Sequence, residues 1–379
     1  MNSDNTYDIA IVGGGLAGLS LSIQAAKNGY RVILFEKEKY PFHKVCGEYI
    51  SLESWDFMEE LGLPLSEMNL PVIRKLIVSA PNGKTLEHML PLGGFGISRF
   101  KLDAMLASIA AKLGVEIREG TKVQNIVFEN NQYIIDGSGF SVNALAAAGA
   151  FGKRSNIDTQ WQRKFVMQKP GKLNNYVGIK YHIEYDFPDD TIALHNFKNG
   201  YCGISRVEDG KYCLCYLTTA ENLRVSNNDI KKMESDILSK NPFLEKIFSG
   251  AKYLTGSPTV ISQISFSEKT QVENHLLMAG DAAGMITPLC GNGMSMAMHA
   301  SKIAFMIIQR YLQKSITLKE MENEYQQDWN YHFQDRLKAG RIIQRFFGSP
   351  VLSNLLISSL KPFPGLVNTI IGKTHGQPF

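Results

Sequence analysis

The chain has 379 residues, of which 44% are hydrophobic, and its 40 basic and 36 acidic residues leave a net charge of +4. A chain of this length is too long for one ordinary hydrophobic core, so we expect two closely packed domains. The charge balance is nearly even, and the basic residues form no concentrated patch in the sequence. This pattern argues against a nucleic-acid partner.

The five cysteines are odd in number and scattered, which argues against a disulfide framework and indicates a reducing compartment, by default the cytoplasm. They are Cys46, Cys202, Cys213, Cys215 and Cys290. Residues 1–8 lack the basic region of a secretory signal. No stretch reaches the ~18 apolar residues of a membrane-spanning helix, but residues 351–360 and 366–371 are apolar enough to leave peripheral membrane contact open.

The first elements in chain order are a strand, a helix and a second strand. Residues 7–13 predict a short buried strand, residues 16–28 a helix that ends at Gly29, and residues 31–36 another strand. Because the three close within about thirty residues, they predict a right-handed parallel crossover.

Later segments predict a sheet of a different kind. A helix at residues 102–113, short strands at 115–135 and a buried strand at 142–149 come first. Apolar and polar residues then alternate over residues 177–187, which predicts an antiparallel strand with one buried face and one wet face. Turn residues predict hairpins at 81–83, 199–200 and 209–210. The chain then predicts a strand at 275–279, a helix at 293–313, and further helices from 319 onward with proline breaks.

We therefore expect an α/β (α+β) protein with a Rossmann-like dinucleotide-binding domain, a second domain with an antiparallel sheet, and a helical C-terminus. The expected dinucleotide-binding domain is discontinuous and comprises residues 1–70, 97–155 and 265–315. The expected substrate domain comprises residues 71–96 and 156–264, and the helical region comprises residues 316–379.

A glycine-rich turn follows the first strand. Gly13, Gly15 and Gly18 have the spacing in which the first glycine makes a tight turn, the second admits a diphosphate, and the third lets helix and strand approach. The start of the helix then binds the phosphates. Glu36 ends the second strand, where a carboxylate accepts hydrogen bonds from a ribose diol and repels the 2′-phosphate of NADP. These residues predict FAD or NAD as the cofactor.

A second motif near the end of the chain decides between the two. Residues 278–294, from Met278 through Asp281 and Gly291-Asn292-Gly293 to Met294, resemble the second FAD-binding motif of the superfamily that contains geranylgeranyl reductases, aromatic hydroxylases (group A flavin monooxygenases) and flavin-dependent halogenases. The resemblance implies that Asp281 binds the ribityl chain. It also implies that Gly291, Asn292 and Gly293 lie against the flavin ring, with the following helix directed at the ring.

Two further segments support the same resemblance. Residues 97–103 resemble the segment whose arginine, Arg99 here, touches FAD and whose aspartate, Asp103 here, starts a helix. Residues 44–48, which include Lys44 and Cys46, resemble the Cys-Gly-Glu signature of geranylgeranyl reductases. The remaining members of the expected FAD-binding set are Ala17, Val123, Gly280, Pro288 and Met294.

Cys46 is the single catalytic candidate. The resemblance implies a cysteine beside the flavin and the double bond being reduced, where it could donate a proton; the alternative is a small buried residue that packs under the ring. Cys213 and Cys215 face the same side of one strand without further zinc ligands, so we expect core packing and no metal site. The histidines have no catalytic spacing and are expected to be structural.

The sequence also departs from its relatives in this superfamily. Phe151 stands where many hydroxylases carry an aspartate associated with FAD and NADPH contacts, which leaves the electron donor open between NAD(P)H and a separate reductant. Residues 200–205 lack the tryptophan of the isoprenoid reductases, and the halogenase signature is missing from the sequence.

The resemblance implies an FAD-dependent enzyme that reduces a carbon-carbon double bond in a hydrophobic isoprenoid, lipid or polyketide. One alternative is a monooxygenase that hydroxylates an aromatic or quinone-like substrate, and another is a flavin- and lipid-binding protein without turnover. The oligomeric state stays open.

Overall fold

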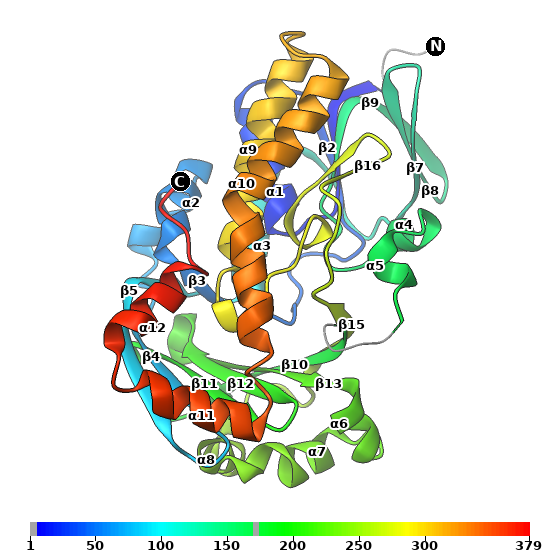
Figure 1. The fold of residues 1–379 in the computed structure, drawn as a ribbon. Coiled ribbons are helices and arrows are strands. Elements are labelled where there is room, and N and C mark those ends of the chain that lie inside the picture. Colours follow the sequence, from blue (N-terminus) through cyan, green and yellow to red (C-terminus); the bar gives the residue numbers. More distant parts are fainter. Residues whose placement is uncertain (1–5, 170–173) are drawn as a thin grey trace.

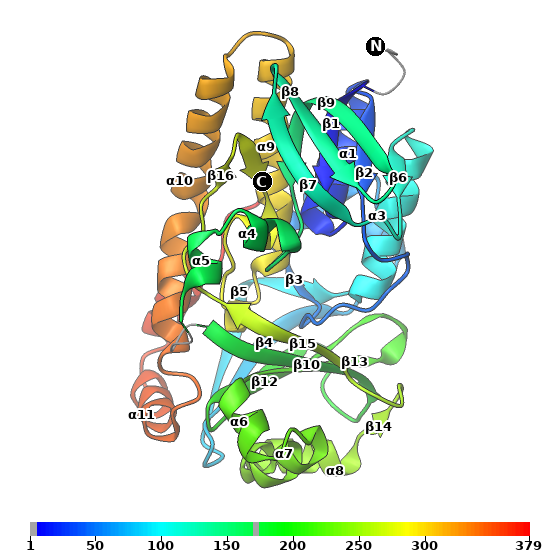
Figure 2. The same cartoon turned by 90° about the vertical axis from the view of Figure 1, so that its right-hand side faces the viewer.

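A computed structural model describes residues 6–169 and 174–379, which fold around two sheets (Figures 1 and 2). The first sheet contains β1 (Thr6–Val12), β2 (Val32–Phe35), β6 (Glu116–Arg118), β7 (Val123–Glu129), β8 (Gln132–Gly137), β9 (Phe140–Gly149), β16 (Val272–Glu273) and β17 (Leu276–Met278). The second sheet contains β3 (Tyr49–Ser51), β4 (Val72–Ser79), β5 (Thr85–Gly96), β10 (Asn174–Glu184), β11 (Thr191–Phe197), β12 (Gly200–Arg206), β13 (Tyr212–Thr219), β14 (Lys252–Tyr253) and β15 (Thr259–Ser265).

The helices lie between and around these sheets. They are α1 (Leu16–Lys27), α2 (Trp55–Leu61), α3 (Arg99–Lys112), α4 (Asn156–Gln160), α5 (Lys164–Met167), α6 (Ala220–Val225), α7 (Ile230–Asp236), α8 (Pro242–Gly250), α9 (Gly293–Leu312), α10 (Leu318–Gln344), α11 (Pro350–Leu360) and α12 (Pro364–Gly372).

The first sheet is a Rossmann-like layer. Its strand order is β16-β17-β9-β1-β2-β6, and β1 runs parallel to both β2 and β9. The largely buried β1 and the fully buried β2 have the continuous apolar sequence of parallel strands that are covered on both faces. Helix α1 packs against α3 and α9. The predicted strand, helix and strand at the start of the chain are thus confirmed, as is the predicted α/β fold class.

The second sheet is mostly antiparallel. Its order is β14-β10-β13-β12-β11-β4-β5-β3, with β15 pairing β10. The three predicted hairpins are confirmed, because β4 pairs β5, β11 pairs β12 and β12 pairs β13 in antiparallel register. Helices α6 to α8, which the sequence analysis does not predict, cover one face and form a second apolar core with it. The domain boundaries remain a prediction.

The polar face of β10 differs from the expectation. The alternation predicts that this face is wet, but every residue from Tyr176 to Ile183 is buried. The Ile179 side of the strand contacts the core under α6 to α8. The other side faces the first domain, where a Cβ on Gly178 would lie 2.9 Å from a methyl group of Val45. The polar face is therefore covered by a distant segment of the chain, which a local pattern does not reveal.

The end of the chain is helical, as predicted. Helix α10 packs along α9, and α11 and α12 lie on the outside of the second sheet, next to β5 (Figure 1). In the described part of the chain, no single helix is long and apolar enough to cross a membrane. Helices α11 and α12 reach that length and composition only when taken together, across a bend of 118°.

Candidate FAD-binding and active site

Two glycines of the turn after β1, Gly13 and Gly18, lie too close to neighbouring backbone atoms to carry a side chain. Gly13 has a φ of +113°, and a Cβ there would lie 2.3 Å from the carbonyl oxygen of Ala150. A Cβ on Gly18 would lie 1.9 Å from the carbonyl oxygen of Gly13, so only glycine lets α1 approach β1 this closely. Gly15 is the N-cap of α1 and has no side chain to cap the first turn. The free N–H groups of that turn can therefore donate to an anion bound next to Gly15.

Glu36 braces this turn from the second strand. Its Oε2 accepts a hydrogen bond from the N–H of Gly14 (2.9 Å), and its Oε1 accepts one from the N–H of Glu38 (3.1 Å). The hydroxyl of Tyr40, which the sequence analysis does not single out, donates to the carbonyl oxygen of Gly14 (2.5 Å). Each carboxylate oxygen can accept a further bond, so Glu36 can hold the turn and still accept from a ribose hydroxyl.

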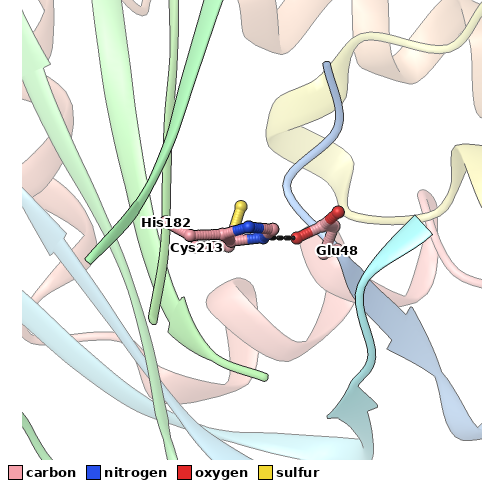
Figure 3. Close-up of side chains that lie close together, drawn as sticks. All are labelled: Glu48, His182 and Cys213. Carbon is pink, nitrogen blue, oxygen red and sulfur yellow. Dashed lines mark hydrogen bonds and ion pairs between the residues drawn. The ribbon is translucent and has the colours of Figure 1, made fainter. Parts of the chain in front are cut away.

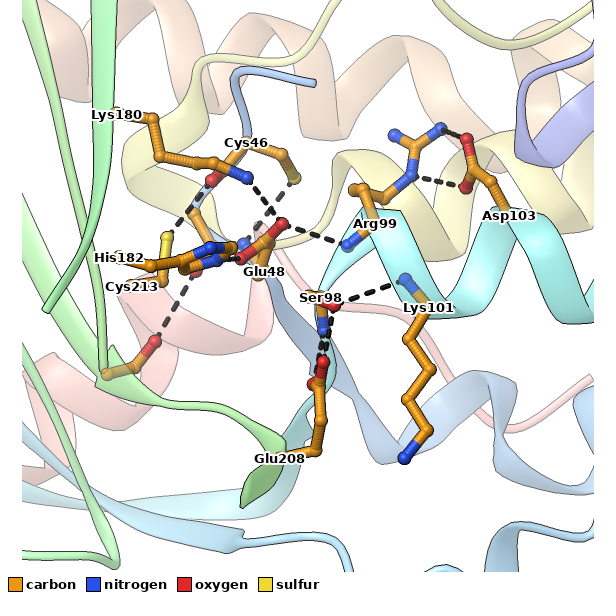
Figure 4. Close-up of polar contacts among 12 residues, drawn as sticks. Cys46, Glu48, Ser98, Arg99, Lys101, Asp103, Lys180, His182, Glu208 and Cys213 are labelled. Carbon is orange, nitrogen blue, oxygen red and sulfur yellow. Dashed lines mark hydrogen bonds and ion pairs between the residues drawn. The ribbon is translucent and has the colours of Figure 1, made fainter. Parts of the chain in front are cut away.

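Two cations face Gly15 from other segments. A Cβ built on Gly15 would lie 3.8 Å from Nη2 of Arg99 and 3.8 Å from Nζ of Lys44, so the space is open and lined by positive charge. Asp103 holds both cations. Two hydrogen bonds join it to Arg99 (2.7 and 2.8 Å; Figure 4), and one ion pair joins it to Lys44 (2.9 Å). Burial alone would raise the pKa of Asp103, but Arg99 and Lys44 outweigh burial and hold it below its usual value.

The structure corrects one role within this segment. The expectation that Asp103 starts the helix is wrong, because α3 begins at Arg99 and Ser98 is its N-cap. The Ser98 hydroxyl accepts a hydrogen bond from the N–H of Lys101 (3.2 Å), as serine caps do. Asp103 lies one turn later, where its carboxylate reaches back to the Arg99 guanidinium.

The distant Gly280-Asp281 turn meets the start of α1. Gly280 has a φ of +61°, and a Cβ there would lie 3.2 Å from the Cβ of Ala17. Burial raises the pKa of Asp281, and the charges of Lys269, Arg99 and Lys153 oppose the rise. The amine of Lys269 donates to the backbone carbonyl of Asp281 (2.7 Å). Asp281 and Arg99, from distant parts of the chain, therefore lie close enough for their charges to interact.

The loop before α9 contacts the Cys46 segment. Gly291 has a φ of +65° and lies against the Tyr49 ring, where a Cβ would come within 3.0 Å. Gly293 is the first residue of α9, and the sulfur of Met294 lies 3.6 Å from Sγ of Cys46. The Asn292 amide donates to the carbonyl oxygen of Thr374 (2.9 Å), while its buried Oδ1 finds no donor among residues 6–169 and 174–379. Such an acceptor suits a ligand N–H.

Two members of the expected set lie outside this cluster. Pro288 is exposed at the start of a short 3-10 turn. Val123 is buried at the start of β7, and its carbonyl oxygen accepts a bond from Asn156 (3.1 Å). The N–H of Thr121 donates to the carbonyl oxygen of Glu36 (2.9 Å), which brings the start of β7 to the same end of the sheet as Glu36.

A buried cluster behind Cys46 is absent from the predicted set. Glu48 is fully buried, and Lys180 Nζ (2.6 Å), His182 Nε2 (2.5 Å) and the N–H of Arg99 (2.8 Å) surround its carboxylate (Figures 3 and 4). Burial opposes ionisation, but these partners lower the pKa of Glu48 to about 2. Two features of the sequence point to this cluster. Glu48 ends the Cys-Gly-Glu segment, and Lys180 and His182 lie on the polar side of an alternating strand.

This cluster holds the backbone around Cys46. Glu48 has a φ of +57°, which is strained for a residue with a side chain, and its N–H points at Sγ of Cys46 (3.5 Å). The thiol of Cys213 donates to the carbonyl oxygen of Cys46 (3.2 Å), so Cys213 faces the site instead of only filling the core. Burial raises the pKa of the Cys46 thiol, with Arg99 opposing, and the thiol is protonated at neutral pH.

Glu48, His182 and Cys213 also lie close enough to share a metal ion. His182 and Glu48 are already joined by a hydrogen bond, however, and the Lys180 ammonium contacts the same carboxylate. A metal ion would have to break that bond beside a fixed positive charge, so the geometry favours a hydrogen-bonded cluster.

The remaining candidate histidines have local packing roles. His195 contacts the hydroxyl of Ser79 (2.8 Å) and stacks on Phe243, and burial lowers its pKa to about 4. His299 stacks on Phe379, and burial lowers its pKa to about 3. His43 stacks on Phe100 beside His182.

Known proteins share both the nucleotide domain and the whole fold. Residues 6–172 match the family model described as FAD binding domain. Digeranylgeranylglycerophospholipid reductase of Methanocaldococcus jannaschii is 26% identical, with 90% of this chain and 88% of that protein covered. Conditioned medium factor receptor 1 of Dictyostelium discoideum is 24% identical, with 88% and 69% covered.

Solved structures agree in fold. A geranylgeranyl bacteriochlorophyll reductase-like protein from Thermoplasma acidophilum superposes with a TM-score of 0.79 at 18% identity, with 99% of this chain and 97% of that chain covered. A flavin-dependent brominase gives a TM-score of 0.78 at 19% identity, with 97% and 93% covered. The residues around Gly15 also fit the diphosphate of FAD, since an open anion site and two cations lie together there. The chain is therefore an FAD-binding oxidoreductase, similar in sequence to digeranylgeranylglycerophospholipid reductases and similar in fold to flavin-dependent halogenases.

Proposed function

We propose that this enzyme reduces a carbon-carbon double bond in a hydrophobic, isoprenoid-type lipid. The observation that carries the proposal is the 3.6 Å contact between Cys46 and Met294, because it puts a protonated thiol beside the loop that begins α9. The names of the reductases that align with 85–90% of the chain support a lipid with geranylgeranyl chains as the substrate class.

The residues would hold FAD in an extended form. The Gly13–Gly18 turn and the first turn of α1 would bind the diphosphate, with Arg99 and Lys44 neutralising its charge. Glu36 would accept from the adenosine ribose and Asp281 from the ribityl hydroxyls. The loop formed by Gly291, Asn292 and Gly293 would lie against the ring. When bound in this way and reduced by an electron donor, the flavin would supply the hydride for the reduction.

Cys46 would supply the accompanying proton. As one carbon of the double bond receives a hydride, Sγ of Cys46 donates its proton to the neighbouring carbon, and the resulting thiolate regains a proton from water. The charge of Arg99 favours the thiolate in the interval, and the N–H of Glu48 fixes the direction of the sulfur. Glu48 and Cys213 are positioning residues in this scheme, since both act on the backbone and sulfur of Cys46.

The test is anaerobic turnover. Purified enzyme with FAD reduced by dithionite is mixed under argon with a digeranylgeranylglycerophospholipid, and the lipid is analysed by mass spectrometry. We expect a gain of two hydrogen atoms for each reduced bond, without oxygen. If no lipid is reduced under argon and an aromatic substrate gains oxygen in air, the enzyme is a monooxygenase and the proposal fails.

The electron donor is tested separately. The oxidised enzyme is incubated under argon with NADH and with NADPH, and flavin absorbance is followed. Bleaching by either nucleotide identifies a direct donor, whereas a stable yellow colour indicates a separate reductant protein. The replacement of the expected aspartate by Phe151 favours the second outcome.

A further inference from the structure

Helices α11 and α12 form an apolar surface that faces away from the protein. Their inner residues, Ile357 and Val367, pack with Val78 and Leu86 of the second sheet. Several of their outer side chains are also apolar: Val351 is 75% exposed, Leu355 64%, Phe363 60% and Leu366 50%. A surface helix in water normally pairs an apolar inner face with a polar outer face. The outer side of these two helices instead mixes large exposed apolar side chains with a few small polar ones, such as Ser358, Ser359 and Asn368. So many exposed apolar side chains suit a surface other than water.

The charged side chains of residues 336–379 have one sign. After Asp335 the chain contains no aspartate or glutamate. Arg345 precedes α11, Lys361 connects α11 to α12, and Lys373 follows α12, and all three are exposed. None of the three forms an ion pair within the described part of the chain, whereas Arg341 is paired with Glu268 (2.9 Å). The apolar outer face is therefore bordered by free cations.

A cavity opens beside the same surface. It has a volume of about 270 Å³ and lies between the strand residues Leu90–Gly93 and the chain after α12, with Ile371 and His375 in its wall. Tyr49 also lines the cavity and is buried, and its ring contacts Gly291 in the loop before α9. An apolar chain that enters beside α12 would thus approach the loop next to Cys46.

We propose that α11 and α12 dock this enzyme on the surface of an anionic lipid bilayer. The apolar side chains of Val351, Leu355, Phe363 and Leu366 enter the boundary between headgroups and acyl chains, and Arg345, Lys361 and Lys373 contact the anionic headgroups. Three unpaired cations beside exposed apolar side chains complement an anionic bilayer, which offers negative headgroups above acyl chains. Because α11 and α12 meet at a bend of 118°, they do not form one straight span, and the arrangement fits a protein that lies on the membrane surface.

The experiment measures vesicle binding without turnover, so its result is independent of the proposed reaction. FAD-loaded protein is mixed with vesicles of phosphatidylcholine alone or of phosphatidylcholine with phosphatidylglycerol, and bound protein is separated by flotation. We expect binding to the anionic vesicles, weaker binding to neutral vesicles, and release by salt. Equal binding to both vesicle types, or to neither, overturns the proposal.

Variants assign the binding to this surface. Leu355→Glu and Lys361→Glu should each lower the partition coefficient on anionic vesicles ~10-fold or more. The matched controls are Val225→Glu, at a similarly exposed position on α6, and Lys246→Glu on α8, and both should bind as the parent protein does. Flavin absorbance shows whether each variant is folded.

A second copy of this chain is the alternative partner for the outer face of α11 and α12. If the parent protein is a dimer by light scattering and Leu355→Glu is a monomer, while neither binds vesicles, the face is an interface between two copies and the membrane proposal is wrong. If Leu355→Glu and Val225→Glu bind vesicles equally well, another surface contacts the membrane and the proposal is also wrong.

Discussion

Nζ of Lys180 lies 2.6 Å from Oε1 of Glu48, although the two residues are 132 positions apart, and both side chains are buried. Lys180 belongs to β10 in the second sheet, whereas Glu48 belongs to the loop that carries Cys46. This ion pair therefore connects the second sheet to the loop that carries the catalytic candidate. Since Glu48 also accepts from the N–H of Arg99, the same carboxylate links the sheet to the start of α3.

The first prediction concerns the stability of this pair. Replacing Glu48 with Gln leaves the Lys180 ammonium buried without a counter-charge, which should cost about 3–5 kcal/mol in the free energy of unfolding. The double variant Glu48→Gln/Lys180→Met removes both charges and should recover part of the loss. Urea unfolding measures both values.

An exposed pair provides the control for that measurement. Lys75 and Glu87 are 2.7 Å apart, but both side chains are more than a third exposed, so Glu87→Gln should lower the stability much less than Glu48→Gln. Similar losses of stability in Glu48→Gln and Glu87→Gln would mean that the buried ion pair stabilises the fold no more than the exposed one.

The second prediction concerns acid. The folded pKa of Glu48 is about 2, below the ordinary value of 4.5. A lowered pKa stabilises the folded state fully above about pH 4.5, and that stabilisation is lost as the pH falls toward 2. Over this range the parent protein should lose ~3 kcal/mol more than Glu48→Gln, which has no carboxylate to protonate there. Parallel curves of unfolding free energy against pH would contradict the assigned pKa.

The sequence predicts the local part of the site well. The strand, turn and helix from β1 to α1 follow from spacing alone, because the close contact of Gly18 with Gly13 lies within this unit. The hairpins of the second sheet follow for the same reason, since their turn residues are adjacent in the chain.

Long-range contacts cannot be predicted in the same way. The alternation in β10 predicts one wet face, yet the cover of that face comes from the Val45 segment, more than a hundred residues earlier. The parallel pairing of β4 with β11 is likewise long-range. Glu48 belongs to the Cys-Gly-Glu segment, but the sequence does not reveal its partners, because only the fold brings Lys180 and His182 beside its carboxylate.

The third prediction tests the anion site at Gly15. A Cβ at Gly15 meets no atom closer than 3.8 Å, so Gly15→Val should fold but fill the space at the start of α1. We expect a colourless protein that melts near the temperature of the parent apoprotein and below that of the FAD-loaded parent. Gly256→Ala, at a position with no atom within 4 Å, should keep its flavin. Normal flavin content in Gly15→Val would show that the diphosphate lies elsewhere.

The fourth prediction tests the cation beside that site. Lys44→Met removes one of two charges facing Gly15 and should weaken FAD binding about 10- to 100-fold, as expected for a charge-assisted hydrogen bond. The loss should shrink at high salt. Lys101→Met is the control, because the Lys101 side chain points away from the Arg99 guanidinium (Figure 4). Flavin fluorescence titration of the apoprotein gives both dissociation constants, and equal effects in the two variants would exclude a specific role for Lys44.

The fifth prediction separates the two roles of Cys46. If its thiol donates the proton, Cys46→Ala should slow lipid reduction by about 10²- to 10⁴-fold while flavin content and hydride donation to an artificial acceptor stay unchanged. Cys46→Ser, which keeps a transferable proton, should recover part of the rate. Because burial raises the thiol pKa, the donor stays protonated from pH 6 to about 8, so this group should cause no loss of rate across that range.

A cysteine outside the site provides the control for the fifth prediction. Cys202 is buried in β12, and Cys202→Ala should reduce the lipid at the parent rate. If Cys46→Ala instead reduced the lipid at the parent rate in the anaerobic assay, the thiol would only pack beneath the flavin ring. The proton would then have to come from another donor, and His182, held by Glu48 at 2.5 Å on the same side of the site, would be the next group to replace.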